Sequence, residues 1–200
     1  MKSYLFSAVI VFSMLVMNIA FADSGNTNHP EYGRSIHEYR TPNVQLIDAQ
    51  ENEIDFADAV ANEEMVIISF AFTSCTGTCP VITANLVRAI PELQKTEGSY
   101  RIFLISLDPE HDTPARLRTY EQRFGIEDNI TLLTGNRNAI HDLLRAYNAV
   151  YPGGNRMNHQ PLTLVRAGSD APWIRLEGLV SGSNLAHEVR IAIEQANQTS

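Results

Sequence analysis

Cys75 and Cys79 are the only two cysteines in the chain of 200 residues. They lie four positions apart in the segment FAFTSCTGTCP, after an apolar run and directly before Pro80. Two thiols in such a pair can form a disulfide that stabilises the fold, take part in thiol–disulfide exchange, or bind a soft metal ion as thiolates. The elements around the pair help to rank these three kinds of chemistry.

A purely structural disulfide is the weakest of the three interpretations. A bridge between positions 75 and 79 closes a very short loop, which restricts the unfolded chain little and therefore stabilises the fold little. The chain without its first 22 residues is still long enough for one domain with a full-sized hydrophobic core. Such a domain does not need the bridge.

The pair stands between a predicted strand and a predicted helix. Residues 65–72, MVIISFAF, form a continuous apolar run typical of a strand buried on both faces. Pro80 suits the first turn of a helix, and apolar residues recur after it at helical spacing as far as Leu93. We expect Pro91 to kink or end this helix near residues 87–90. Free N–H groups at the helix start favour a thiolate at Cys79.

Strands and helices alternate along the rest of the chain. Predicted strands cover residues 101–107, 129–133, 161–167 and 173–179, the last two as a hairpin, and predicted helices cover 114–124, with Thr113 as its cap, 136–147 and the segment after a Ser183 cap. Residues 43–60 add two short elements, which we interpret as an N-terminal hairpin. The pattern predicts an α/β fold with a central mixed sheet flanked by helices, whose site lies at the carboxyl ends of the strands.

The first 42 residues are predicted to lie outside this domain. Lys2, the apolar run that follows it and the small residues Ala20 and Ala22 are typical of a signal peptide over residues 1–22. Residues 23–42 are polar without a period, which indicates a flexible lead-in, and residues 43–200 form the domain. We therefore expect export to the periplasm, with membrane association only if the leader remains as an anchor.

Among the six histidines, His159 is the best candidate for a third ligand beside the cysteines. It lies in YPGGNRMNHQPLTLV, a glycine-containing loop directly before a predicted strand. The other histidines, at positions 29, 37, 111, 141 and 187, fall in the lead-in, in an acidic turn or on helix surfaces. Two thiolates are soft ligands that select Cu(I), and an imidazole suits Cu(I) or Cu(II).

The acidic composition argues against a nucleic-acid partner. The formal net charge is −8, and no Lys/Arg cluster stands out.

The segments FAFTSCTGTCP, LISLDPEHDTPARLRTYEQRFG and MNHQPLTLV resemble the Sco/SenC family, over about residues 42–195. The resemblance implies a thioredoxin-like fold that binds copper and helps to assemble the copper centre of respiratory oxidases. It implies that Cys75, Cys79 and His159 are the copper ligands. It also implies that Asp108 is an outer-shell or functional acid near them, although Asp108 would equally suit a turn cap before Pro109.

Three functions remain open from the sequence. The first is a copper metallochaperone that delivers copper to an oxidase subunit or another copper protein, or maintains the thiols of such a partner. The second is a thiol–disulfide oxidoreductase in which Cys75 attacks and Cys79 resolves the mixed disulfide. The third is a partner-binding domain whose cysteines have lost their role. His159 discriminates the first two, because only a three-coordinate copper site needs it.

Overall fold

The computed structural model describes residues 32–96, 98–150 and 160–199. The described elements alternate as the sequence predicts. In chain order they are β1 (Gly33–His37), β2 (Gln45–Asp48), β3 (Glu53–Asp55), α1 (Phe56–Ala61), β4 (Met65–Ala71), α2 (Thr78–Leu93), β5 (Tyr100–Ser106), α3 (Pro114–Phe124), β6 (Ile130–Thr134), α4 (Arg137–Ala146), β7 (Leu162–Ala167), β8 (Trp173–Glu177) and α5 (Gly182–Thr199).

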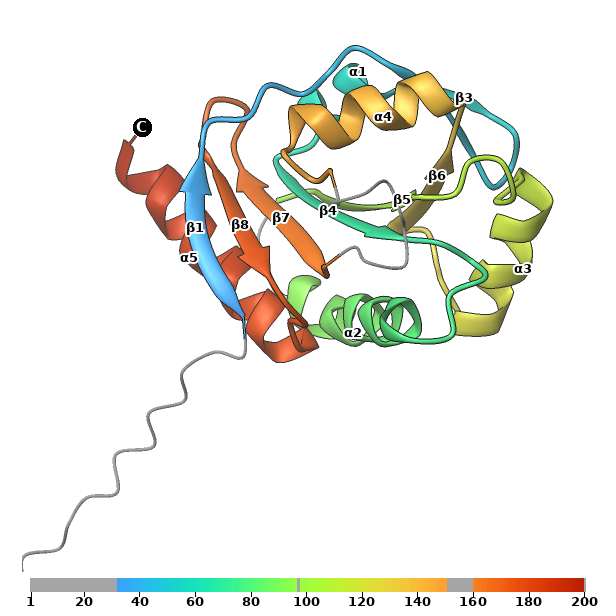
Figure 1. Cartoon of the computed structure of the whole chain (residues 1–200). Coiled ribbons are helices and arrows are strands. Elements are labelled where there is room, and N and C mark those ends of the chain that lie inside the picture. Colours follow the sequence, from blue (N-terminus) through green and yellow to red (C-terminus); the bar gives the residue numbers. More distant parts are fainter. Residues whose placement is uncertain (1–31, 97, 151–159, 200) are drawn as a thin grey trace, which may run out of the picture.

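The strands form one sheet in the order β1-β8-β7-β4-β5-β6-β2-β3 (Figure 1). β4, β5 and β6 are parallel, and the remaining neighbours pair antiparallel. The predicted mixed sheet is therefore confirmed. Because β4 and β5 lie side by side in parallel, Ala71 faces Ser106 and the loops that leave the two strands start at the same edge of the sheet.

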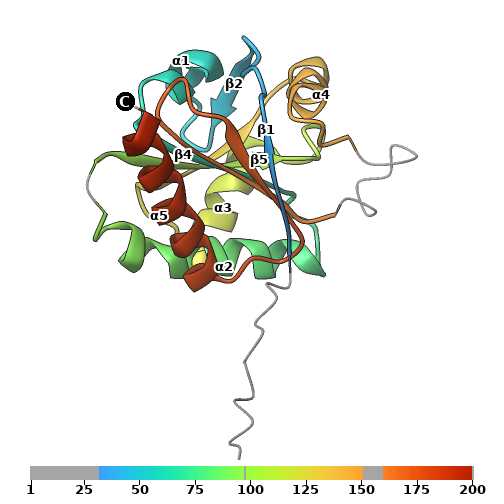
Figure 2. The same ribbon diagram turned by 90° about the vertical axis from the view of Figure 1, so that its left-hand side faces the viewer.

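Helices cover both faces of this sheet. α2, α3 and α5 lie on one face, with α2 packed against α5, and α1 and α4 lie on the other (Figures 1 and 2). All seven residues of β4 are buried, which explains why its sequence is a continuous apolar run rather than an alternating one. This sheet with its two helical layers is the rigid frame that carries the cysteines.

The predicted N-terminal hairpin is confirmed as β2 and β3, which pair antiparallel beyond β6. Its turn is organised by Asp48, whose carboxylate accepts hydrogen bonds at 2.8 Å from the backbone N–H groups of Gln50 and Asn52. The second of the two short elements predicted in residues 43–60 is a strand followed by a helix, because α1 begins at Phe56 directly after β3.

Residues 33–37 are a strand, and the expectation of a flexible lead-in over residues 23–42 is therefore wrong for this part. β1 pairs with β8 at one edge of the sheet. Tyr32 and Arg34 also donate hydrogen bonds to the buried carboxylate of Glu188 on α5, at 2.9 and 2.8 Å. We call Tyr32, Arg34 and Glu188 the β1 anchor. The sequence signal is weak because most side chains of an edge strand face solvent and show no apolar alternation.

Details at the ends of three helices differ from the expectation. α2 does not end near residues 87–90 but continues to Leu93, so Pro91 lies in its last turn, with only two helical residues after it. α5 begins at Gly182, and its cap is Ser181, whose Oγ accepts from Asn184 N–H, rather than Ser183. Thr113 occupies the cap position of α3, but its side chain makes no capping hydrogen bond.

Candidate metal and redox site

The cysteines lie where β4 passes into α2. The chain turns after β4, with a hydrogen bond of 3.2 Å from Cys75 N–H to the Phe72 carbonyl, and α2 begins at Thr78. Both cysteines are buried free thiols, Cys75 with 6% and Cys79 with 0% exposure. We call residues 72–79 the cysteine junction. The predicted placement of the pair between a buried strand and a helix is thus confirmed.

Cys75 is the cysteine with the more acidic thiol. Burial alone would raise the pKa of its thiol, but hydrogen bonds from the Cys79 side chain and from the backbone N–H groups of Cys79, Gly77 and Thr78 outweigh it, and the pKa falls below its ordinary value of 9.0. Three backbone N–H groups at the start of α2 therefore act on Cys75, whereas at Cys79, where the sequence placed this effect, burial outweighs the contribution of its own N–H.

Cys79 is held as a neutral thiol. Burial, followed by its hydrogen bond to Cys75, raises the pKa of the Cys79 thiol to about 12, against a smaller lowering by the Phe72 backbone N–H. Thr83, one turn later on α2, donates to the Cys79 carbonyl at 3.0 Å and lies 2.8 Å from the Tyr120 hydroxyl. The pair is therefore asymmetric, with one sulfur activated and the other protected.

Asp108 follows β5 at the edge of the sheet where the cysteines follow β4. Its side chain is buried, and its Oδ1 lies 2.9 Å from Nδ1 of the more exposed His111. Its backbone N–H donates to Ser106 Oγ at 3.0 Å. A functional role for Asp108 stays a prediction. His111 is exposed, as expected of a histidine in an acidic turn, and its ring contacts Asp108.

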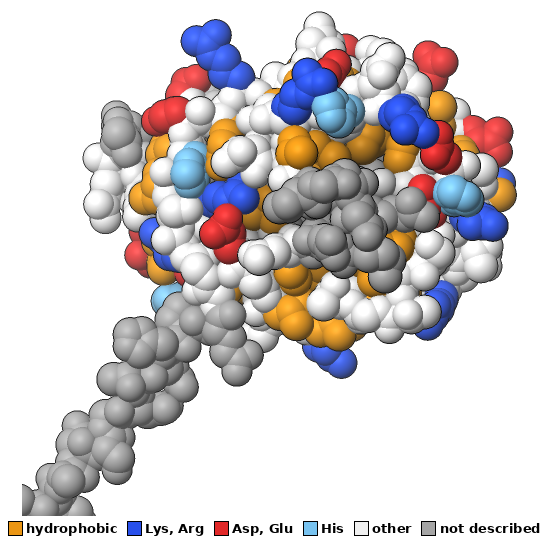
Figure 3. Space-filling view, in the orientation of Figure 1, with side chains coloured by type: hydrophobic (Ala, Val, Ile, Leu, Met, Phe, Trp, Pro, Cys, Tyr) orange, Lys and Arg blue, Asp and Glu red, His pale blue; other side chains and the backbone are white. Residues whose placement is uncertain are grey.

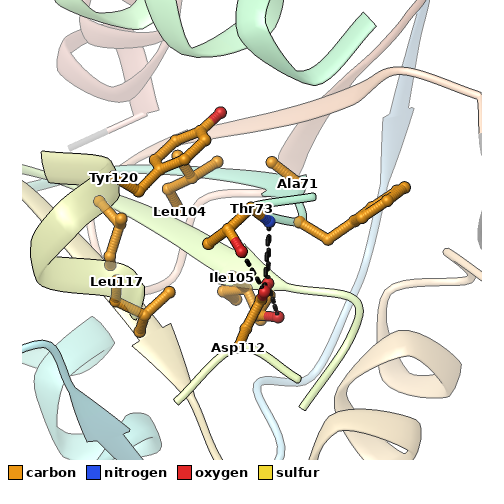
Figure 4. Close-up of a pocket in the computed structure, with 10 residues that line it drawn as sticks. Ala71, Thr73, Leu104, Ile105, Asp112, Leu117 and Tyr120 are labelled. Carbon is orange, nitrogen blue, oxygen red and sulfur yellow. Dashed lines mark hydrogen bonds between the residues drawn. The ribbon is translucent and has the colours of Figure 1, made fainter. Parts of the chain in front are cut away.

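Asp112 is a buried carboxylate that sequence reasoning missed. It is 0% exposed and belongs to the loop after β5, where its side chain contacts the loop after β4 (Figure 4). Its Oδ2 accepts from Thr73 N–H at 3.0 Å and from Ser106 Oγ at 2.6 Å, and its Oδ1 accepts from Thr73 Oγ1 at 2.5 Å. The sequence signal that could have found Asp112 is its position in DPEHDTP, the loop that follows the buried strand β5. This loop leaves the sheet at the same edge as the loop after β4, which carries the cysteines.

A small cavity adjoins Asp112. It has a volume of about 10 Å³ and is lined by Thr73, Asp112, Tyr120 and apolar residues from β4, β5 and α3, among others (Figure 4). This is about the space that one water molecule needs. The cavity is therefore too small to receive an organic substrate.

His159 lies outside the described residues, as do Gly153 and Gly154 and the predicted leader. The chain re-enters the described structure at Gln160, and Thr163 of β7 pairs with Ser69 of β4. The start of β7 therefore lies at the same edge as the end of β4. Within residues 32–96, 98–150 and 160–199, no three His, Cys, Asp or Glu side chains come close enough to hold a metal ion together.

On the face drawn in Figure 3, positively and negatively charged side chains do not gather in separate patches. Lysine, arginine, aspartate and glutamate side chains are interspersed there, and hydrophobic side chains gather nearer the middle. Among the described helices, none combines the length and the apolar character that a membrane span requires.

Comparison with known proteins places these features in a family. The chain is 30% identical over 107 residues to the SCO2-like protein of Rickettsia typhi, a match that covers 54% of this chain and 51% of that protein. The chain thus spans about half the length of the curated relatives it matches.

Solved structures show the same fold. BsSco, a member of the Sco family of cytochrome c oxidase assembly proteins in which a disulfide switch was identified, aligns with a TM-score of 0.66 and 21% identity over 79% of this chain and 95% of that one. Arabidopsis thaliana ScoI with copper bound aligns with a TM-score of 0.64 and 20% identity over 83% of this chain and 99% of that one. The sequence model of the SCO1/SenC family matches residues 37–191, and the chain therefore belongs to the SCO1/SenC family.

Proposed function

We propose that this protein is an exported copper metallochaperone that binds copper through Cys75, Cys79 and His159. The observation that carries the proposal is the pair of adjacent thiols at the β4–α2 junction, which share a hydrogen bond. Two thiolates are the donor set that Cu(I) prefers over hard cations. Family membership and the copper-bound structure of Arabidopsis ScoI support the same assignment.

The described chain that follows His159 supports its role as the third ligand. β7 starts two residues after Gln160 and runs antiparallel to β4. Residues 160 and 161, which lead into β7, therefore lie at the edge of the sheet where β4 ends and the chain continues to the cysteines. The carbonyl of Pro161 accepts a hydrogen bond from Gly178 N–H at 2.8 Å, which fixes the end of this segment to the residue that follows β8.

Copper is cargo in this proposal, and its destination is the copper-bearing subunit of a respiratory oxidase or another copper protein. Copper binding requires both thiols to lose their protons, and the Cys75 thiolate, stabilised by the start of α2, is the first ligand to be available. The leader pattern of residues 1–22 supports export, and a periplasmic location follows from it.

A copper titration of the reduced chain without residues 1–22 tests the proposal. We expect one copper ion per chain. His159→Ala should lower copper affinity by more than the roughly 10–100-fold that loss of an outer-shell partner costs, and should change or abolish any Cu(II)–thiolate absorption. The fold and the Cys75–Cys79 redox couple should remain, since His159 takes no part in disulfide exchange.

His141→Ala and His187→Ala are the matched controls, because both histidines are exposed on the surfaces of helices, α4 and α5. They should bind copper like the parent protein. If His159→Ala also bound copper like the parent, the three-ligand site would be wrong.

A thiol–disulfide oxidoreductase is the second candidate, and the asymmetry of the two thiols favours it. The lowered pKa of Cys75 suits an attacking thiolate, and the raised pKa of Cys79 suits a resolving thiol that stays protonated until the mixed disulfide forms. Its substrates would be cysteine pairs of partner proteins. Normal exchange by a His159→Ala variant, together with unchanged copper binding, would favour this function over the first.

A further inference from the structure

We propose that Asp112 is a positioning residue that sets the geometry of the Cys75–Cys79 pair. Its hydrogen bonds go to Thr73 and Ser106 rather than to either sulfur. Thr73 nevertheless lies two residues before Cys75, within the turn that brings the thiols together. The proposal is that the thiol–disulfide equilibrium of the pair, and its copper affinity, depend on this remote carboxylate.

Two successive peptide groups connect Asp112 to the sulfurs. The N–H of Phe72 donates to the sulfur of Cys79, and the next N–H, of Thr73, donates to Asp112. The carbonyl of Phe72 accepts from Cys75 N–H at 3.2 Å. The short segment from Phe72 to Cys75 is thus bound at one end to Cys79 and at its middle to Asp112, so a shift of Thr73 moves the groups that hold both cysteines.

Asp112 itself is held rigidly to β5. Its backbone N–H donates to the Asp108 carbonyl at 2.8 Å, and its Oδ2 accepts from Ser106, the last residue of β5. β5 is the parallel neighbour of β4. The cysteine junction is therefore fixed to a second strand and not only to β4, from which it emerges.

A buried carboxylate is suited to this task. It accepts hydrogen bonds only, and its neighbours Thr73 and Ser106 supply a backbone N–H and two hydroxyl donors. Burial of a carboxylate is unfavourable unless hydrogen bonds compensate, so the arrangement is stable only while Thr73 stays in place. Hydrogen bonds to a charged acceptor are also stronger than neutral ones, which restricts the motion of the turn.

The thiol–disulfide equilibrium measures this effect without copper. In the reaction with oxidised glutathione, the two protein thiols form a disulfide and two molecules of reduced glutathione leave with the protons and electrons. The equilibrium constant increases when the thiols are held close together. Releasing Thr73 should lower this proximity, and the equilibrium should move toward the dithiol.

The test is a glutathione redox titration of the metal-free chain, for the parent protein, Asp112→Ala and Asp112→Asn. We expect Asp112→Ala to shift the equilibrium toward the dithiol by about tenfold, which corresponds to about 30 mV. Asp112→Asn should shift it by about threefold or less, because the amide still accepts the Thr73 N–H and the hydroxyl groups can rotate to accept from its NH₂ group. A structural role without positioning would leave the potential unchanged.

Asp48→Ala is the matched control. Asp48 is also a buried aspartate that accepts backbone N–H groups, but it is the last residue of β2, a strand that β5 and β6 separate from β4. It should lower thermal stability as Asp112→Ala does and leave the redox equilibrium within twofold of the parent. An equal shift in Asp48→Ala would overturn the positioning role, as would a folded Asp112→Ala variant with the parental equilibrium.

Thr73→Val keeps the inference testable if Asp112→Ala does not fold. It removes the hydroxyl donor to Asp112 and retains the backbone donor and the side-chain shape, so it should shift the equilibrium in the same direction by a smaller amount. No shift in either Thr73→Val or Asp112→Asn would then refute the role. Copper affinity is a second readout that rests on the proposed function. A redox shift without a copper effect would refute the dependence of copper affinity on Asp112, while the positioning of the two thiols by Asp112 would stand.

Discussion

The cysteine junction and the β1 anchor are both held by a buried carboxylate that joins distant parts of the chain. Asp112 joins the loop after β5 to Thr73, and Glu188 joins α5 to Tyr32 and Arg34. The donors differ. Asp112 accepts from a backbone N–H and two hydroxyl groups, whereas Glu188 pairs with a phenol and with a guanidinium that is 29% exposed.

This difference separates a device that positions a site from one that attaches a strand. The hydrogen bond from Thr73 N–H to Asp112 restrains the backbone of the cysteine junction directly. The bonds to Tyr32 and Arg34 end on side chains of an edge segment, where the main consequence is whether β1 stays on the sheet. Changes at the anchor should therefore alter stability alone, and changes at the junction should alter the chemistry.

Glu188→Ala should have the largest effect on stability. It leaves the buried Tyr32 hydroxyl without its acceptor and Arg34 without its partner, and loss of one member of a buried pair typically costs about 3–5 kcal/mol. Because Arg34 is partly exposed, we expect about 3 kcal/mol, measured by denaturant unfolding. Copper binding and the redox equilibrium should not change in the folded variant, and a change in either would break the comparison.

Alkylation of the reduced protein should separate the two cysteines. The pKa of Cys79 is about 12 and that of Cys75 is below 9.0, so Cys75 holds at least about 1000-fold more thiolate at pH 8. The higher intrinsic nucleophilicity of the more basic thiolate offsets about 20–30-fold of this ratio. Mass spectrometry after brief alkylation should therefore find Cys75 modified at least about 30-fold faster.

The pH dependence of alkylation sharpens this prediction. The rate at Cys75 should rise with pH and reach half of its maximum below pH 9, whereas the rate at Cys79 should still be far from its maximum at pH 9. Equal rates at pH 8 would show that the start of α2 does not stabilise the Cys75 thiolate. Asp48→Ala serves as the control, because it should leave both rates unchanged.

Gly182→Ala should have the smallest effect, and it tests whether α5 and the cysteine helix α2 act as one packed unit. A Cβ atom at position 182 would lie 2.9 Å from the backbone carbonyl carbon of Arg88 on α2, so one helix must shift. Overpacking costs about 1–3 kcal/mol, and the better helix propensity of alanine offsets only part of this, because its gain of about 1 kcal/mol applies to a helix interior and Gly182 is the first residue of α5. We expect a net loss of about 1 kcal/mol in thermal unfolding, with the redox equilibrium within twofold of the parent.

Much of the architecture could be predicted from the sequence, because buried positions require apolar residues and the pattern of these residues is visible along the chain. A strand buried on both faces must be apolar throughout, as β4 is, and a helix shows its buried side at a fixed spacing, as α2 does. The position of the cysteines between them followed directly. β1 could not be predicted in this way, because its side chains are mostly exposed and its pairing with β8 spans most of the chain.

The sequence by itself determined the alternation of strands and helices from β4 onward, the family, and the presence of two soft ligands where a buried strand meets a helix. Only the tertiary structure decided which thiol is activated, because that depends on which sulfur the free N–H groups of α2 reach. It also decided that Asp112 reaches Thr73 across 39 positions of sequence. Hydrogen bonds of this kind leave no periodic pattern in a sequence, since they depend on two strand ends that meet only when the sheet has formed.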